Sequence, residues 1–88
     1  MIMTFRQFQK RLAGHIVALR ARTGLTQAEA AKRARITRVH WQRLEGPAPN
    51  PTAETLHRVA GVFKMSLAEL VGAVQSSQPP RADVGREL

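Results

Sequence analysis

A chain of 88 residues is long enough for one compact domain and too short for two. It contains no cysteine, which excludes disulfides and a cysteine-based zinc site, and it lacks both a membrane-spanning apolar run and a secretory signal pattern, so we predict a cytoplasmic protein. The net charge of +8 is confined to residues 1–45, where ten basic residues face two acidic ones. This asymmetry indicates a polyanionic partner such as DNA, RNA or an acidic membrane surface, although a basic face that serves only solubility would look the same.

Five helix starts are marked by a serine or threonine that directly precedes a stretch with helical spacing of apolar residues. Such a side chain can accept hydrogen bonds from the exposed backbone amides of a first turn. The five N-cap residues are Thr4, Thr26, Thr37, Thr52 and Ser66. Three of them are followed three residues later by Gln or Glu, which predicts capping boxes at Thr4–Gln7, Thr26–Glu29 and Ser66–Glu69. The pattern predicts an all-α fold with helices over residues 5–22, 27–34, 38–45, 53–63 and 67–74.

Two segments are predicted to lie outside these helices. Residues 46–51 read Gly-Pro-Ala-Pro-Asn-Pro, which cannot be helical and predicts a stiff surface loop. Residues 75–88 are polar and contain two adjacent prolines, which predicts a disordered tail. The folded domain is therefore expected over residues 1–74.

The helices predicted over 27–34 and 38–45 are short and only three residues apart, as in the steeply angled pair of a helix-turn-helix. Trp41 and Leu44 give the second of these helices an apolar inner side, because their spacing places them on one face. Its outer side is left to Arg38, Val39, Gln42 and Arg43, with His40 at the edge. Arginine can bind guanine through two hydrogen bonds, glutamine can bind adenine, and valine can contact the methyl group of thymine. The pair therefore predicts a helix that reads the DNA major groove.

Several stretches in this order resemble the lambda-repressor-like, Cro/C1-type (XRE) family of helix-turn-helix regulators. They are residues 14–20 (GHIVALR), 24–31 (GLTQAEAA), 36–38 (ITR) and 41–46 (WQRLEG), followed by Pro51 and Leu56. The resemblance covers about residues 12–74. It implies a five-helix domain, which agrees with the five helix starts derived above. It also implies double-stranded DNA as the partner.

The resemblance also implies roles for individual residues. Gln27, which opens the second helix, corresponds to a residue that contacts a DNA phosphate. The residues implied to touch bases are Thr37, Arg38, Val39 and Arg43, with His40 and Gln42 beside them. An arginine late in the first helix pairs in the family with the glutamate that ends the third, here Arg20 with Glu45, and we include Arg20 in the predicted DNA-binding set.

Three positions depart from the family pattern. Arg35 stands where the turn usually has glycine, and a left-handed backbone there would cost an L-residue roughly 1–2 kcal/mol. Trp41 replaces the usual Ile or Val; its spacing favours core packing over stacking on a base. The loop over residues 46–51 has no Lys or Arg to bind phosphate, which leaves Asn50 as its predicted backbone contact.

Other kinds of site find little support in the sequence. His15, His40 and His57 have no ligand spacing and no cysteine or paired acidic residues nearby, so we predict no metal site and no cofactor. The serines and threonines are explained as helix caps, with no helper base at a justified spacing, so we predict no catalytic residue.

The function predicted from these observations is a transcriptional regulator, a repressor or autoregulator, that binds a two-fold operator as a homodimer. Apolar residues on the last two helices are the predicted dimer interface: Val62, Leu67, Leu70, Val71 and Val74. Simple burial within one chain is the alternative for these residues, and the N-terminal Ile2, Met3 and Phe5 are a second candidate surface. A protein-interaction adaptor or antitoxin, docking on a toxin or RNA polymerase, is the rival function. Association of the first helix with a membrane is disfavoured, because its apolar side is needed for the core.

Overall fold

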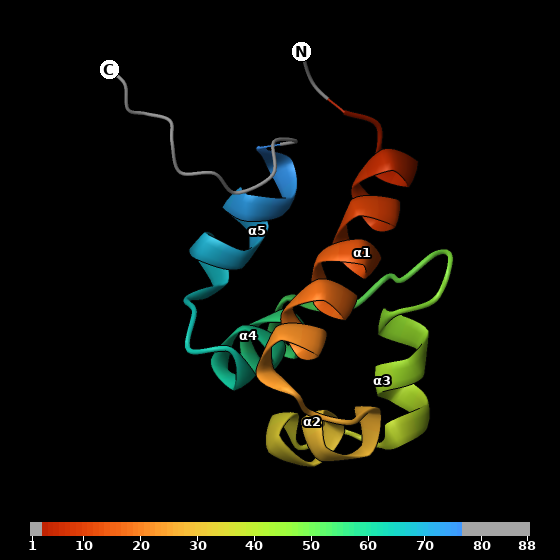
Figure 1. Cartoon of the computed structure of the whole chain (residues 1–88). Helices are drawn as coiled ribbons and strands as arrows, with labels where there is room; N and C mark the ends of the chain where they lie inside the picture. The colour runs from red at the N-terminus through yellow and green to blue at the C-terminus, as the bar shows by residue number, and fades with distance from the viewer. Residues whose placement is uncertain (1–2, 77–88) are drawn as a thin grey trace.

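The protein is all-helical over residues 3–76, the part of the chain that the computed structural model describes, and no strand occurs there (Figure 1). The five helices are α1 (Phe5–Thr23), α2 (Gln27–Ala34), α3 (Arg38–Leu44), α4 (Ala53–Val62) and α5 (Leu67–Gln75). The predicted all-α fold with five helices is thus confirmed. The predicted boundaries differ from the observed ones by one residue at most, always at a carboxyl end.

All five predicted N-caps are confirmed. Each side-chain oxygen accepts a hydrogen bond from the backbone amide three residues later, and each cap residue has the extended backbone that lets the helix begin. The three capping boxes are also present, with Gln7, Glu29 and Glu69 returning a side-chain oxygen to the backbone N–H of the cap. Local sequence signals therefore define where every helix begins.

Three helix ends are closed by a residue in the left-handed conformation. Gly24 ends α1 with φ 73°, Arg35 ends α2 with φ 63°, and Lys64 follows α4 with φ 59°. After α2, Ile36 N–H donates to the Ala31 carbonyl, and after α4, Met65 N–H donates to the Ala60 carbonyl, which is the hydrogen-bond pattern of a Schellman motif. The strained turn expected at Arg35 is therefore real, and Lys64 repeats it.

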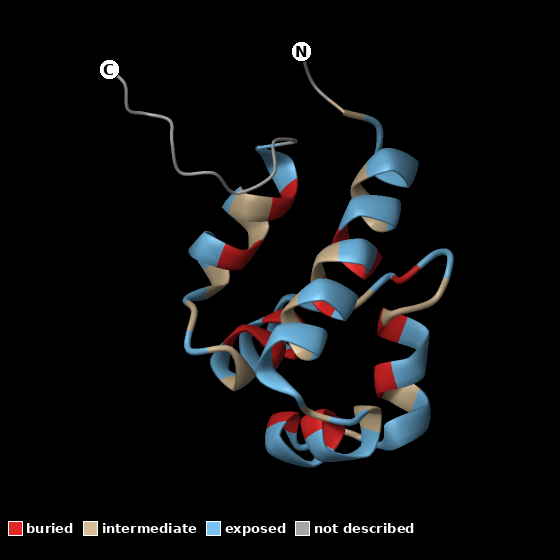
Figure 2. Ribbon diagram, in the orientation of Figure 1, coloured by how far each residue is buried: buried red, intermediate tan, exposed pale blue. Residues whose placement is uncertain are grey.

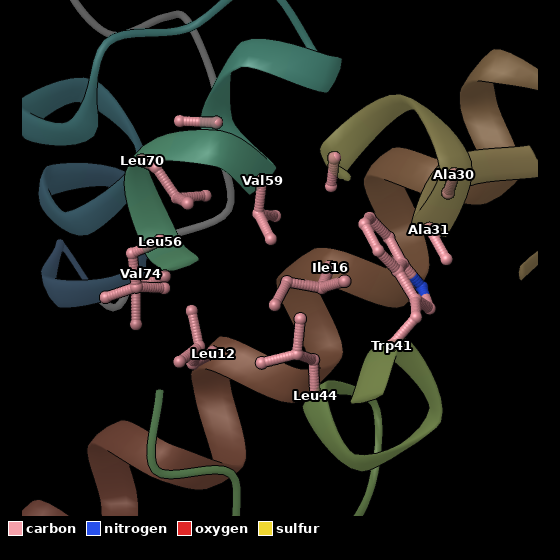
Figure 3. Packing of buried hydrophobic residues seen from close by; sticks show 12 residues of the cluster. Leu12, Ile16, Ala30, Ala31, Trp41, Leu44, Leu56, Val59, Leu70 and Val74 are labelled. Atoms are coloured by element: carbon pink, nitrogen blue, oxygen red, sulfur yellow. The ribbon is translucent and has the colours of Figure 1, made fainter. Parts of the chain in front are cut away.

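The core lies where α1 meets the other helices. Helix α1 packs against α5 and α3, while α2 packs against α3 and α4, and α4 against α5. The buried faces of all five helices turn inward (Figure 2). Figure 3 shows Leu12 and Ile16 of α1 surrounded by apolar side chains from the other four helices.

Trp41 is the largest fully buried side chain, and its predicted place in the core is confirmed. It extends from α3 toward Ala31 of α2 and Ile16 of α1 (Figure 3), and its ring meets Phe63 edge-on at a centroid distance of 6.1 Å. The small alanines of α2 leave the space that the indole fills. Trp41 thus fills the space between α3, α2 and α1.

Two predicted dimer-interface residues are corrected by the structure. Leu70 and Val74 are fully buried within a single chain, because they form the inner face of α5 against α1 and α4, so they are not available to a partner. Val62, Leu67 and Val71 are half-buried at the margin of the same core. Burial within one chain was the correct alternative for two of the five.

The predicted tail begins too early. Gln75 is the last residue of α5 and Ser76 is its C-cap, so both belong to the helix rather than to a tail. The remaining tail residues, 77–88, and the candidate interface residue Ile2 lie outside the described residues. Among residues 3–76, none of the helices combines the length and apolar character that crossing a bilayer requires.

Candidate nucleic-acid interface

The outer side of α3 presents to solvent the four side chains that were predicted to lie there. Arg38, Val39, Gln42 and Arg43 are all exposed, and Val39 is 55% exposed although it is apolar. At about 100° per residue they span roughly 140° of the helix surface, directly opposite the buried Trp41 and Leu44. Burial of those two residues therefore forces the four polar or aliphatic side chains outward as one face.

Thr37 and His40 lie beside this face with different roles. Thr37 is the N-cap of α3, and its hydroxyl oxygen accepts the His40 backbone N–H at 3.0 Å. His40 is half-buried at the edge of the face, as predicted from its spacing. Both residues thus fix the start of α3, where the exposed face begins.

A hollow, here called the loop hollow, separates this face from the loop between α3 and α4. Five of the predicted DNA-binding residues line it: Val39, His40, Gln42, Arg43 and Asn50. The loop holds its shape because Pro49 is buried and its carbonyl accepts a hydrogen bond of 2.9 Å from Gln9 Nε2 of α1. Asn50 is thereby held, exposed, opposite α3.

Gln9 is a functional candidate that the sequence prediction missed. It lies on α1 at helical spacing from the buried Ala13 and Ile16, so a polar side chain there interrupts an otherwise apolar stripe. The sequence could therefore have indicated that Gln9 forms a specific contact, because a polar group on a buried face needs a hydrogen-bonding partner. The partner, Pro49, is forty residues away in sequence and could not be named in advance.

A second hollow lies at the amino-terminal end of α2. It is lined by Arg20, Thr26, Gln27, Ala28 and Arg38, so Arg38 of α3 faces the first turn of α2. The first backbone N–H groups of a helix carry partial positive charge and favour anions. The positive helix end, the guanidinium of Arg38 and the amide of Gln27 together suit a phosphate group.

Glu45, the C-cap of α3, accepts hydrogen bonds from three helices. Arg20 of α1 donates through Nε to Oε2 and through Nη2 to Oε1, the latter at 3.1 Å. Gln27 Nε2 of α2 donates to Oε1 at 2.9 Å, and the indole Nε1 of Trp41 donates to Oε2 at 2.7 Å. The implied pairing of Arg20 with Glu45 is present in the structure, and the two further donors make Glu45 the point that orients α3 relative to α1 and α2.

Electrostatics keep this carboxylate charged. Burial raises the pKa of Glu45, but the hydrogen bonds from Arg20, Trp41 and Gln27, together with the charge of Arg20, outweigh burial and lower the pKa below its ordinary value. The same hydrogen bond from Arg20 to Glu45 raises the pKa of Arg20 against its desolvation. A charge-assisted, two-point contact of this kind is stronger than a neutral hydrogen bond.

The Glu45 contacts change the interpretation of two predicted DNA-binding residues. Arg20 uses Nε and Nη2 on Glu45 and Nη1 on the Leu25 carbonyl, which gives it a positioning role, while its two remaining N–H groups leave the direct DNA contact a prediction. Gln27 uses one N–H of its amide on Glu45 and keeps a second N–H for a ligand. Among residues 3–76, no three His, Asp or Glu side chains gather as metal ligands.

Comparison with known proteins agrees with this geometry. A family model described as a helix-turn-helix domain, of the Cro/C1 (XRE) group, matches residues 11–72, which is more than two thirds of the chain. The chain belongs to this helix-turn-helix family. The family resemblance drawn from the sequence is thereby confirmed, with α2 and α3 as the helix-turn-helix, and it indicates a DNA-binding regulator. No curated protein and no solved structure gives a significant match.

Proposed function

We propose that this helix-turn-helix protein is a sequence-specific transcriptional regulator, a repressor or autoregulator, that inserts α3 into the DNA major groove. The observation that carries the proposal is the outer face of α3, where Arg38, Val39, Gln42 and Arg43 stand exposed opposite a buried tryptophan. These side chains supply paired donors for guanine, a donor and an acceptor for adenine, and a methyl surface for thymine.

Contacts to the DNA backbone are proposed from both sides of that face. The first turn of α2, with the free N–H of Gln27 and the guanidinium of Arg38, would hold one phosphate. Asn50 of the loop hollow would hold another, since the loop itself supplies no basic side chain. Such contacts fix the register of α3, and the base contacts then select the sequence.

A two-fold dimer follows from how little sequence one copy can read. Helix α3 has seven residues, so a second copy placed one DNA turn away, about 34 Å, would double the readout. Of the predicted interface residues, Leu67 and Val71 of α5 keep accessible apolar surface. Val62 of α4 also does, but it lies among basic residues, where a second copy would meet like charges.

The DNA proposal is tested by selecting bound duplexes from a randomised library at near-physiological salt. We expect enrichment of an inverted repeat whose half-sites are about 10 base pairs apart, centre to centre. Recovery of duplexes without a common motif, at the same affinity as the starting library, would contradict sequence-specific recognition.

The dimer is tested separately by light scattering on the wild type and on Val71→Asp. We expect a dimeric wild type and a folded monomeric variant, whereas Val17→Asp, on the exposed side of α1, should stay dimeric. A monomeric wild type at high concentration, or a dimeric folded Val71→Asp, would defeat the α5 interface. Val74 is unsuited to this test because it belongs to the core.

A further inference from the structure

A third hollow lies away from the DNA face, between the carboxyl ends of α2 and α4. We call it the α2–α4 hollow and define it by Arg33, Arg35, Arg58, Val62, Lys64 and Met65. An adjoining hollow shares Arg33, Val62 and Lys64 with it and continues toward Leu25 and Phe63. Neither has a lining residue in common with the loop hollow or with the hollow at the start of α2.

The rim of the α2–α4 hollow is strongly basic. Arg33, Arg35, Arg58 and Lys64 are all exposed, and no carboxylate from residues 3–76 lines the hollow itself. Arg58 bonds Glu54 at 2.7 Å outside it, across an exposed pair in which the carboxylate is 72% exposed. Two of the cations come from each half of the sequence, so the positive field gathers here only through folding of α2 against α4.

The floor of this hollow is apolar. Val62 and Met65 are half-buried, pack on the hydrophobic core from one side and line the hollow from the other. The hollow has a volume of about 370 Å³, at the small end of ligand sites and sufficient for a few side chains. A phosphate backbone would satisfy the rim and leave this floor without a partner.

Stabilisation of helix ends does not explain the arrangement alone. Cations near the carboxyl ends of α2 and α4 do oppose the negative ends of the helix dipoles. However, Arg35 and Lys64 occupy the two left-handed positions where glycine would avoid a steric cost. Exposed cations elsewhere in the last turns could serve the dipoles without that cost, so their place on the rim points to a ligand.

We propose that the α2–α4 hollow binds an acidic, amphipathic helical segment of a partner protein. Carboxylates of the segment would pair with Arg33, Arg35, Arg58 and Lys64, while an apolar side chain would rest on Val62 and Met65. A second copy of this chain is a poor occupant, because each carboxylate of residues 3–76 is already engaged: Glu29 and Glu69 in capping boxes, Glu45 with Arg20, and Glu54 with Arg58. The site leaves the α3 face free, so the regulator can hold DNA and this partner at once.

The probe is a fluorescein-labelled synthetic peptide of about 16 residues built from Glu and Leu, in which the leucines recur at i, i+3, i+4 and i+7 so that they form one helical stripe. Two control peptides carry the same residues in an order without the stripe, or Lys in place of Glu. We expect the wild-type protein to bind the striped acidic peptide at least about tenfold more tightly than either control at about 150 mM salt. Equal binding of the acidic and scrambled peptides would overturn the proposal.

The site is located with two charge-matched double variants. Arg33→Glu with Lys64→Glu should weaken peptide binding by at least about tenfold. Arg6→Glu with Lys10→Glu, at exposed positions of α1, changes the net charge equally and should weaken it by less than about threefold. Equal losses in both would mean that only the overall field attracts the peptide, and the hollow would be rejected.

Two further measurements on the wild type make the outcome independent of how the variants fold. Amide chemical-shift changes on adding the peptide should cluster at the end of α2 and over Gly61–Met65, and shifts confined to α3 would overturn the proposal. Excess duplex DNA should leave the peptide bound. Displacement of the peptide by DNA would assign the hollow to the nucleic-acid surface, and a peptide-sensitive dimer mass would assign it to a second copy, either of which contradicts a separate acidic partner.

Discussion

The outer face of α3 and the α2–α4 hollow are both basic, yet their chemistry differs. On α3, two arginines flank a valine and a glutamine on a ridge that a groove can accept. In the hollow, four cations surround an apolar floor. The ridge suits base edges and phosphates, whereas the hollow suits carboxylates on an apolar helix. Positive charge alone therefore does not define a nucleic-acid surface; what lies between the charges does.

The two regions are also held in place by different means. The ridge depends on Glu45, which receives donors from α1, α2 and α3 and so fixes the angle of α3. The hollow depends on two left-handed turns that stop α2 and α4 side by side. Each region can therefore be perturbed while the other is left intact.

The largest expected effect is the response of DNA binding to salt. A dimer making about 6–10 phosphate contacts should lose roughly 10³–10⁵ in affinity between about 50 and 200 mM salt, because bound counterions are released. The acidic peptide should respond much less, since its apolar contact is insensitive to screening. Fluorescence anisotropy titrations measure both, and a flat salt response for DNA would contradict the role of the α3 region.

Next in size is removal of the Glu45 carboxylate. Glu45→Ala leaves Arg20, Gln27 and Trp41 without their acceptor and should lower the free energy of unfolding by about 2–4 kcal/mol, less than for a fully buried pair because the Arg20 side chain is 21% exposed. Urea denaturation followed by circular dichroism measures the loss. Glu54→Ala removes an exposed ion pair and should cost less than about 1 kcal/mol. Similar losses in the two variants would show that the three-donor contact adds little.

The same carboxylate gives stability a pH dependence. Because folding lowers the pKa of Glu45 relative to its ordinary value of about 4.3, the unfolded chain takes up the proton first as the pH falls. The contribution of Glu45 is therefore complete above that value and is lost as the pH falls through the folded pKa. The free energy of unfolding of the wild type should exceed that of Glu45→Gln at neutral pH, and this difference should shrink below about pH 4.3. An advantage that grows on acidification would have the wrong sign.

The smallest expected effects have opposite signs at neighbouring arginines. Arg35→Gly should raise the free energy of unfolding by about 1 kcal/mol, because glycine adopts the left-handed conformation without a steric cost. Arg33→Gly, in the last turn of α2, should lower it by about 1 kcal/mol. Both remove a cation of the hollow, so both should weaken acidic-peptide binding and leave DNA recognition unchanged. Thermal unfolding distinguishes them, and a shared sign would reject the strain at Arg35.

Most of the fold was predictable because helix starts are encoded locally. The two hydrogen bonds of the capping box join Thr26 and Glu29, which are only three residues apart, so the contact can be predicted from the local sequence. The outer residues of α3 were predictable for the same reason, since the spacing of Trp41 and Leu44 decides which side is buried. The left-handed turn at Arg35 was implied by the family resemblance, in which this position of the turn is usually glycine.

Apart from the Arg20–Glu45 pair, which the family resemblance implied, contacts between distant residues could not be predicted from the sequence. Gln27 meets Glu45 across eighteen residues and Gln9 meets Pro49 across forty, and both depend on the angles at which helices cross. Those angles follow from how side chains of all five helices pack together, which no single spacing in the sequence reports. The same limit explains the assignment of Val74 to an interface, because an apolar stripe on a last helix looks alike whether it covers the core or a partner.

The central claim is that α3, and not the more strongly basic α2–α4 hollow, reads DNA sequence. It is tested by measuring the affinity of the selected duplex and of its single-base-pair variants. Arg38→Ala and Arg43→Ala should each lose about 1–3 kcal/mol and relax the preference at one base pair. The double variant Arg33→Ala with Lys64→Ala removes two positive charges, as many as the two α3 variants together. Its affinity for the selected duplex should fall by less than about threefold, and it should keep every base preference. Unchanged discrimination in both α3 variants, or lost discrimination in the hollow variant, would contradict the account.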